Sequence, residues 1–297
     1  MSASVSVPAT HPTWRYWRKR LVSVAIDLFV WGVLLVMILP AVWIVLTSIR
    51  NPVEVNTSPI VWIPKELTLD GFKPLFGQAT IATGSIPFDQ YLRNSLLAAL
   101  GSTALALVVG TMAGYAFARF QFRGKNTLFL GLILSRAVPG IALGLPLFVL
   151  FARMGLADKV WGLALVYMAL NIPFTIWLMD GFFRQIPIEL SEAALIDGCS
   201  YWGTFLRINL PLALPGLAAS AIFAFLAAWN EFQLAVVLTR TINSKTAPVG
   251  LFDFTGQFTI DWRGMAALSV LMMIPAIIVV LLVQRSLVRG LTLGAVK

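Results

Sequence analysis

The sequence contains almost none of the residues on which metal-dependent and nucleophilic enzymes rely. Cys199 is its single cysteine and His11 its single histidine. One cysteine excludes an intrachain disulfide and a thiolate metal site, and one histidine in a polar tail excludes a histidine relay. No catalytic triad, nucleophile elbow or metal-ligand cluster is recognisable. We therefore expect neither a metal cofactor nor the activity of a membrane-embedded enzyme.

Charged residues are also scarce. They make up 12% of the chain, against 59% hydrophobic residues, whereas an average soluble domain has about 25% charged residues. In a chain of 297 residues, this composition indicates a polytopic membrane protein. The net charge of +9 suggests nucleic acid at first, but the cations lie in short segments between apolar runs, where membrane topology accounts for them. No nucleic-acid partner is expected.

Apolar runs divide the chain into six expected membrane spans of about 20 residues or more. They cover residues 21–46, 91–117, 128–151, 161–179, 212–238 and 265–283, which predicts an all-α polytopic fold. The third span contains Pro139 and Pro146 and should be irregular. Gly110 and Gly114 in the second span would allow a close approach between helices.

The positions of basic residues predict the topology. Arg18, Lys19 and Arg20 precede a first apolar run that is too long for a cleavable signal. We therefore expect a retained first span with a cytoplasmic tail at 1–20. The loop around Arg123 and the tail 285–297 are also basic, so both termini should be cytoplasmic. Residues 50–89 would then form an external loop with little regular structure.

A polar segment at residues 184–211 interrupts the apolar pattern between the fourth and fifth spans. It reads as two short helices joined by a turn, because it is rich in Ala, Glu and Leu. Gly198 can end the first helix in a left-handed cap, and Ser200 can cap the start of the second.

Within this segment, Glu192-Ala193-Ala194, Gly198, Ile208, Leu210 and Pro211 resemble the EAA signature of ABC importer permeases. The likeness is greatest to carbohydrate permeases of the maltose-transporter (MalG-like) type. It runs from about Leu21 to Lys297, with a second specific stretch at 290–297. The resemblance implies a type I importer permease (MetI-like) fold and a coupling segment that docks on a separate ATPase subunit. The implied coupling residues are Glu192, Ala193, Ala194, Gly198, Ile208 and Pro211.

The chain has no nucleotide site of its own. Residues 124–127, Gly-Lys-Asn-Thr, lack the upstream glycine of a phosphate loop and join two spans rather than a strand and a helix. ATP and Mg²⁺ are therefore expected on separate ATPase subunits, with no cofactor in this chain. The resemblance implies as further partners a homologous second permease, two ATPase copies and an extracytoplasmic solute-binding protein. It also implies a multi-pass location in the bacterial cytoplasmic (inner) membrane.

Polar residues inside the spans are the candidates for a substrate path, because polar groups in hydrocarbon normally face the bundle interior or a wet cavity. They are Arg136, Tyr167, Asn171, Asn230, Glu231 and Gln233, with Trp229 and Phe232 as further aromatic faces for a sugar. Hydrogen bonds between helices are an equal alternative for Asn171. Arg136 and Glu231 would either form an ion pair at a gate or contact the sugar. The run 229–232 resembles a segment of sugar permeases, which favours a functional Asn230.

These features predict one half of the channel of an ATP-driven, binding-protein-dependent importer for a sugar or sugar derivative. The alternative is an ion-coupled secondary transporter or exporter, which needs an ionisable relay in the membrane and often has inverted repeats. Only Asp27, Arg136 and Glu231 lie in or near spans, and no inverted repeat is evident. The sequence does not identify the sugar.

Overall fold

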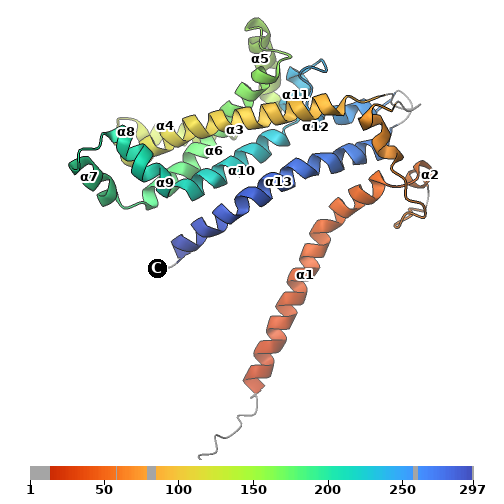
Figure 1. Ribbon diagram of the computed structural model, residues 1–297, viewed down its shortest axis with the longest axis horizontal. Helices are drawn as coiled ribbons and strands as arrows, with labels where there is room; N and C mark the ends of the chain where they lie inside the picture. Colours follow the sequence, from red (N-terminus) through yellow and green to blue (C-terminus); the bar gives the residue numbers. More distant parts are fainter. Residues whose placement is uncertain (1–13, 58, 79–84, 257–259, 296–297) are drawn as a thin grey trace, which may run out of the picture.

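The computed structural model of the chain describes residues 14–57, 59–78, 85–256 and 260–295. Within these ranges every regular element is helical, and the β contacts are two isolated bridges. Four helices are long and apolar enough to cross a membrane (Figure 1): α1 (Trp14–Ser48), α3 (Phe88–Arg119), α6 (Val160–Gln185) and α13 (Trp262–Ala295).

Two bent pairs of helices meet the same criterion together. The first consists of α4 (Lys125–Ser135) and α5 (Gly140–Arg153), bent by 97°; the second consists of Tyr201–Leu212 and α10 (Leu214–Trp229), bent by 75°. By length and composition, the described residues thus hold up to six spans when each pair counts as one. Together with the lack of strands in the described residues, this matches the expected all-α polytopic fold.

Shorter elements connect the long ones. They are α2 (Pro52–Val55), η1 (Asp70–Phe76), α7 (Ile188–Ile196), α8 (Tyr201–Thr204), the π-helix η2 (Phe205–Asn209), α9 (Leu210–Leu212), α11 (Gln233–Leu238), α12 (Ala247–Gly250) and η3 (Leu251–Phe254). Residues 1–13 of the expected N-terminal tail lie outside the described residues, as do the side chains of the expected tail 285–297 with its stretch 290–297.

Helices α3 and α6 form the centre of the bundle, and α10 packs against both. Their contact depends on two glycines of α3. A Cβ on Gly110 would lie 2.6 Å from Thr175 Cγ2, and a Cβ on Gly114 would lie 2.7 Å from Met179 Cβ. Both distances are shorter than carbon atoms tolerate, so only glycine allows this approach. The expected small-residue contact is confirmed.

The bend between α4 and α5 follows from Pro139. Proline has no backbone N–H and disfavours a helical conformation in the residue before it. The chain therefore leaves the helix at Arg136 and starts again at Gly140, with Pro139 in an extended conformation at the N-cap. Pro146, by contrast, lies inside α5. The expected irregular third span is thus two helices.

Two helices differ from the expected spans. The fourth span was expected to end at residue 179, but α6 continues to Gln185. The added turn is stabilised by Asp180 and Arg184, which pair one turn apart. Arg184 Nε lies 3.0 and 2.8 Å from the two carboxylate oxygens of Asp180. The fifth span was expected to run through residue 238. Instead α10 ends at Trp229, and α11 begins at Gln233.

Helix α1 diverges from the rest of the bundle (Figure 1). Every side chain from Trp17 to Pro40 is exposed, and burial begins near Ala41. The helix contacts α13 at the end where α2 lies, so the remaining helices form the compact part of the chain.

Candidate functional site

The segment 184–211 lies at one end of the long helices, opposite α2 and α12 (Figure 1). Helix α7 carries the three motif residues Glu192, Ala193 and Ala194. Glu192 and Ala193 are exposed, whereas Ala194 is buried. Of the two alanines among the implied coupling residues, only Ala193 is thus accessible to a partner, while Ala194 packs against the protein. Exposed apolar side chains complete this face; Ile196 is 86% exposed.

The turn after α7 has the predicted form. Gly198 adopts a left-handed conformation with φ of 86°, and the N–H of Cys199 donates to the carbonyl of Ala194 at 2.9 Å, which is the closing contact of a glycine C-cap. Ser200 Oγ then accepts the N–H of Gly203 at 3.1 Å and caps α8. Further along, Ile208 is half-buried in η2 and Pro211 is exposed in α9.

Beneath α7 lies a buried polar network centred on Asn209, which has no exposed surface. Its Oδ1 accepts from Arg119 Nη2 at 3.3 Å and from Ser191 Oγ at 3.2 Å. Its Nδ2 donates to Ser191 Oγ at 3.0 Å, to the Thr204 carbonyl at 3.3 Å and to Tyr115 Oη at 3.5 Å. The network joins α3, α7, α8 and η2.

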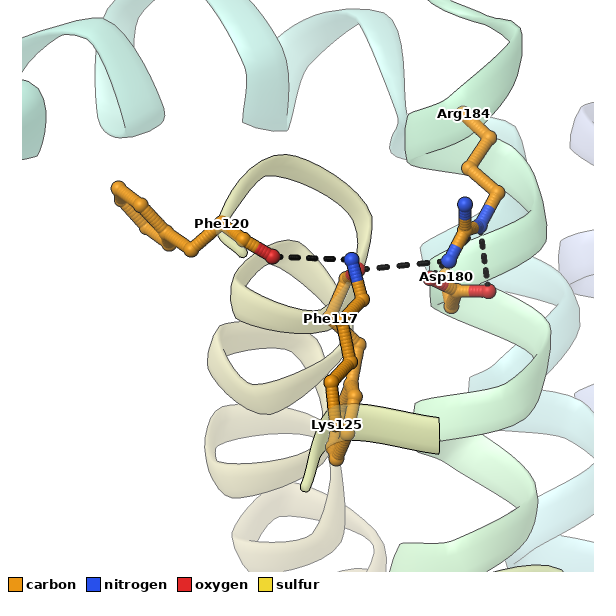
Figure 2. A network of polar contacts seen from close by, with 5 residues as sticks. All are labelled: Phe117, Phe120, Lys125, Asp180 and Arg184. Carbon is orange, nitrogen blue, oxygen red and sulfur yellow. Dashed lines mark hydrogen bonds and ion pairs between the residues drawn. The ribbon is translucent and has the colours of Figure 1, made fainter. Parts of the chain in front are cut away.

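A second group of polar contacts lies at the same C-terminal end of α3 (Figure 2). Arg184 Nη2 donates to the carbonyl of Phe117 at 3.4 Å while its Nε binds Asp180. Lys125 Nζ donates to the carbonyl of Phe120 at 2.9 Å. The last carbonyls of a helix have no partner within it and carry partial negative charge, so two cations satisfy the end of α3 next to segment 184–211.

A cleft of about 510 Å³ lies among α4, α5, α6, α10 and α11. Five of the six candidate substrate-path residues line it: Arg136, Tyr167, Asn171, Glu231 and Gln233. The sixth, Asn230, does not. It is exposed, and its Nδ2 donates to the carbonyl of Leu226 at 2.9 Å, where it closes the end of α10.

Glu231 caps α11. Its two carboxylate oxygens accept the N–H of Leu234 at 2.8 Å and of Ala235 at 3.0 Å, which explains why the helix restarts after the break. Arg136 instead lies over the ring of Phe174, 5.0 Å from the ring centroid. Among the ion pairs of the described residues, none joins Arg136 to Glu231.

Asn171 and the two further aromatic candidates, Trp229 and Phe232, differ in what their side chains contact. Asn171 Nδ2 donates to the carbonyl of Ala224 at 3.2 Å and so bonds α6 to α10 while it borders the cleft. Trp229 is fully buried, stacks on Phe225 and donates to the carbonyl of Met272. It is therefore part of the core rather than a face for a sugar. Phe232 packs near Phe252.

The sequence did not reveal the residues whose side chains make the polar contacts around segment 184–211. Asp180 and Arg184 had a usable signal, because an acid four residues before a base is a typical helical pair. Asn209 stands out only as a single polar residue between Ile208 and Leu210. Nothing local connects it with Arg119, which lies 90 residues earlier.

Comparisons with known proteins place the chain among transport permeases. The family model described as the binding-protein-dependent transport system inner membrane component matches residues 106–293. A probable ABC transporter permease protein, y4oR, of Sinorhizobium fredii is 40% identical over 90% of this chain and 93% of its own length. The trehalose transport system permease protein SugB of Mycobacterium tuberculosis is 38% identical over 88% of this chain and 92% of its own.

A solved structure is also similar in fold. It is a bacterial ABC transporter involved in the import of the acidic polysaccharide alginate. One of its chains superposes with a TM-score of 0.71 at 19% identity, over 94% of this chain and 99% of that one. The family match extends from the middle of α3 to near the end of α13, so it includes both the cleft and segment 184–211.

Proposed function

Since the chain belongs to the family of binding-protein-dependent transport system inner membrane components, we propose that it forms half of the translocation channel of an ATP-driven importer for a sugar or sugar derivative. The observation that carries the proposal is the geometry of segment 184–211. A short helix exposes Glu192, Ala193 and Ile196 at one end of the membrane-length helices, and the buried Asn209 network joins that helix to the end of α3.

Helix α7 is the contact with a separate ATPase subunit. Its exposed apolar side chains, Ile188, Leu190 and Ile196, need a partner surface to cover them. Glu192 would orient the contact through a basic residue of that partner. ATP and Mg²⁺ bind to the ATPase subunits, because this chain has no phosphate loop.

The assembly contains a homologous second permease, two ATPase copies and an extracytoplasmic solute-binding protein. The end of the molecule that carries α7 faces the cytoplasm, and the end that carries α2 and α12 faces outward. The start of α1 and the end of α13 both lie away from the α2 end (Figure 1), which supports two cytoplasmic termini. The basic residues Arg18, Lys19 and Arg20 at the start of α1 agree with this orientation.

The cleft is the part of the substrate path that this chain supplies. Its volume of about 510 Å³ falls in the range of small-molecule sites, about 300–1,000 Å³. Amide and carboxylate groups of Asn171, Gln233 and Glu231 line it together with apolar side chains. The trehalose permease among the relatives supports a sugar as the substrate class.

An ion-coupled transporter is the second candidate, and the cleft argues against it. Such a mechanism needs a carboxylate that can exchange protons or ions within the membrane. Glu231 is the carboxylate that lines this cleft, and both of its oxygens accept backbone N–H groups of α11. Loss of uptake on adding a proton uncoupler at constant ATP would favour the ion-coupled mechanism.

The test is ATP hydrolysis by the reconstituted complex with its binding protein, across neutral sugars, polyols and anionic sugar derivatives. We expect stimulation by one ligand, and loss of that stimulation in Glu192→Lys. Glu66→Lys makes the same charge change on an exposed residue near the opposite end and should leave stimulation intact. An assembled complex that no sugar stimulates would contradict the substrate class, and a chain that assembles with no ATPase would contradict the importer.

A further inference from the structure

We infer that Asn209 is a positioning residue that fixes the coupling helix α7 to the end of α3, so that α7 and the membrane helices move as one body. This role rests on the proposed coupling function of α7. Its evidence is the set of four segments that meet at a single buried amide: α3 through Arg119, α7 through Ser191, α8 through the Thr204 carbonyl, and η2, which contains Asn209 itself.

Helix α7 has little other packing to hold it. Of its nine residues, only Ser191 and Ala194 are buried. Ala194 contributes a single methyl group, so the directed contacts of α7 with the protein interior are those between Ser191 Oγ and the Asn209 amide, at 3.0 and 3.2 Å. Besides the backbone at its two ends, this pair is thus the directed route by which a force on the exposed face of α7 reaches the protein interior.

On its other side, the amide is tied to a membrane-length helix. Arg119 is in the last turn of α3, and its Nη2 donates both to Asn209 Oδ1 and, at 2.8 Å, to the carbonyl of Ile186 just before α7. One guanidinium thus holds the beginning of the coupling segment and, through Asn209, its end. Tyr115 on α3 adds a longer contact to the same amide.

The chemistry requires an amide rather than any buried polar group. Asn presents an acceptor oxygen and two N–H donors on one planar group. Here the oxygen faces the donors of Arg119 and Ser191, while the nitrogen faces the Thr204 carbonyl. A leucine of similar size would leave these groups buried without partners, which is costly. An aspartate would keep the bonds to Arg119 and Ser191 but lose the donor to Thr204.

The backbone at Asn209 is itself unusual. Residues 205–209 form a π-helix, in which the N–H of Leu210 donates to the carbonyl of Phe205. Such wide turns are rare and often mark functional sites. The Asn209 side chain donates to the Thr204 carbonyl one residue before this turn, so the same amide also supports the local distortion.

Apolar contacts alone would not fix the register of this joint. Phe183, Phe205 and Tyr115 pack against one another beside Asn209, but apolar contact is non-directional and tolerates sliding. Hydrogen bonds weaken steeply when their geometry changes, so the bonds of the Asn209 amide favour one arrangement of the segments that they join. We therefore assign the apolar cluster to stability and the Asn209 network to the transmission of movement.

The test uses the whole reconstituted complex and measures ligand uptake per ATP hydrolysed together with basal ATP hydrolysis. For Asn209→Leu we expect assembly with the ATPase and basal hydrolysis within about twofold of wild type, but uptake per ATP lower by about tenfold, since a directed buried contact is lost. Asn209→Asp should recover only part of that ratio, because it keeps the bonds to Arg119 and Ser191 but places a carboxylate oxygen against the Thr204 carbonyl. Ser220→Ala is the matched control, because Ser220 Oγ is buried without a hydrogen-bond partner in the described residues.

Two results would overturn the inference. One is an assembled Asn209→Leu complex with a wild-type ratio. The other applies if Asn209→Leu does not assemble. Ser191→Ala, which removes a single hydroxyl group, is then tested instead, and we expect it to lower the uptake per ATP by about threefold. An unchanged uptake per ATP in Ser191→Ala would refute the role. If Glu192→Lys abolishes the stimulation of ATP hydrolysis while the Asn209 and Ser191 variants keep the wild-type uptake per ATP, the proposed function stands but the Asn209 role does not. If Glu192→Lys has no effect, the coupling function of α7 itself fails.

Discussion

The carboxylate of Asp158, in the turn before α6, accepts the backbone N–H of Thr241, 83 residues further along the chain, at 2.9 Å. It also accepts the N–H of Arg240 at 2.8 Å and the hydroxyl groups of Thr241 and Ser244. Asp158 itself has a φ of 59°, a left-handed conformation that Asp tolerates better than most residues. The contact ties the α5–α6 turn to the segment after α11, and so holds one end of the cleft wall together.

This contact makes stability depend on pH. Burial alone would raise the pKa of Asp158, but hydrogen bonds from Ser244, Thr241 and Arg240 outweigh it and lower the pKa from 3.8 to about 2. Because the folded pKa lies below the unfolded one, ionised Asp158 stabilises the fold above a pH of about 4, and this contribution disappears as the pH falls toward about 2. Asp158→Asn should therefore lower the melting temperature of the detergent-purified protein at pH 7 by about 2–4 °C.

The pH series supplies the control for that variant. The difference in melting temperature between wild type and Asp158→Asn should narrow between pH 4 and pH 2, where the wild-type carboxylate becomes protonated. A difference that stays constant over this range would show that the charge of Asp158 does not stabilise the fold.

A second prediction concerns the contact between α3 and α6. In Gly114→Ala, the new Cβ would lie 2.7 Å from Met179 Cβ and 3.1 Å from the backbone nitrogen of Asp180, so the helices must separate. We expect a loss of about 1–3 kcal/mol in the free energy of unfolding, as for other overpacked cores. Gly131→Ala, where nothing lies within 4 Å of the new Cβ, should instead be neutral or slightly stabilising. Equal stability of the two variants would contradict the close approach.

A third prediction separates conformation from size at Gly198. A Cβ on Gly198 would meet nothing within 4 Å, so a larger residue is excluded only by the φ of 86°. Gly198→Val should abolish ligand-stimulated ATP hydrolysis, whereas Gly198→Asn should retain most of it, because Asn adopts left-handed conformations at helix ends. Gly181→Val adds the same side chain to α6, where the space is open and φ is not positive. It should remain active; an active Gly198→Val would refute the role of the turn.

A fourth prediction distinguishes two neighbouring polar residues. Gln233 lines the cleft, whereas Asn230 bonds to its own helix outside it. Gln233→Ala should raise the ligand concentration for half-maximal stimulation by about 2–10-fold, the effect of one lost hydrogen bond. Asn230→Ala should leave it unchanged and affect thermal stability only. A larger effect of Asn230→Ala would place the ligand on the other side of the break between α10 and α11.

The parts of the structure that depend on neighbouring residues could be predicted from the sequence. The left-handed cap at Gly198 and the hydroxyl cap at Ser200 are short-range features, since each bond closes within five residues. The close approach at Gly110 and Gly114 likewise follows from a spacing of four in one helix. For the same reason the turn of segment 184–211 was predicted at the right residues, whereas the π-helix η2 within its second half was not.

The parts that depend on distant contacts could not be predicted. Asn230 and Glu231 are adjacent in the sequence, but the helix break between α10 and α11 sends only Glu231 to the cleft. An ion pair between Arg136 and Glu231 was a reasonable alternative, yet the N–H groups of α11 already satisfy the carboxylate. The Asn209 network joins residues up to 94 positions apart, and no local pattern indicates such a contact.

The length of helix α1 affects how the chain fits into a membrane. Its apolar segment Trp17–Ser48 has 32 residues, which at about 1.5 Å per residue gives a rod of about 48 Å, against a hydrocarbon layer of about 30 Å. A rod of this length fits a bilayer by tilting or by extending one end into the headgroups. Among the described residues, the side chains of α1 are exposed from Trp17 to Pro40 and burial begins near Ala41, so most of the surface of these turns faces the surroundings of the chain. The tilt of α1 in a membrane therefore depends on what surrounds these turns, the lipid or a neighbouring subunit, as well as on its packing against α13.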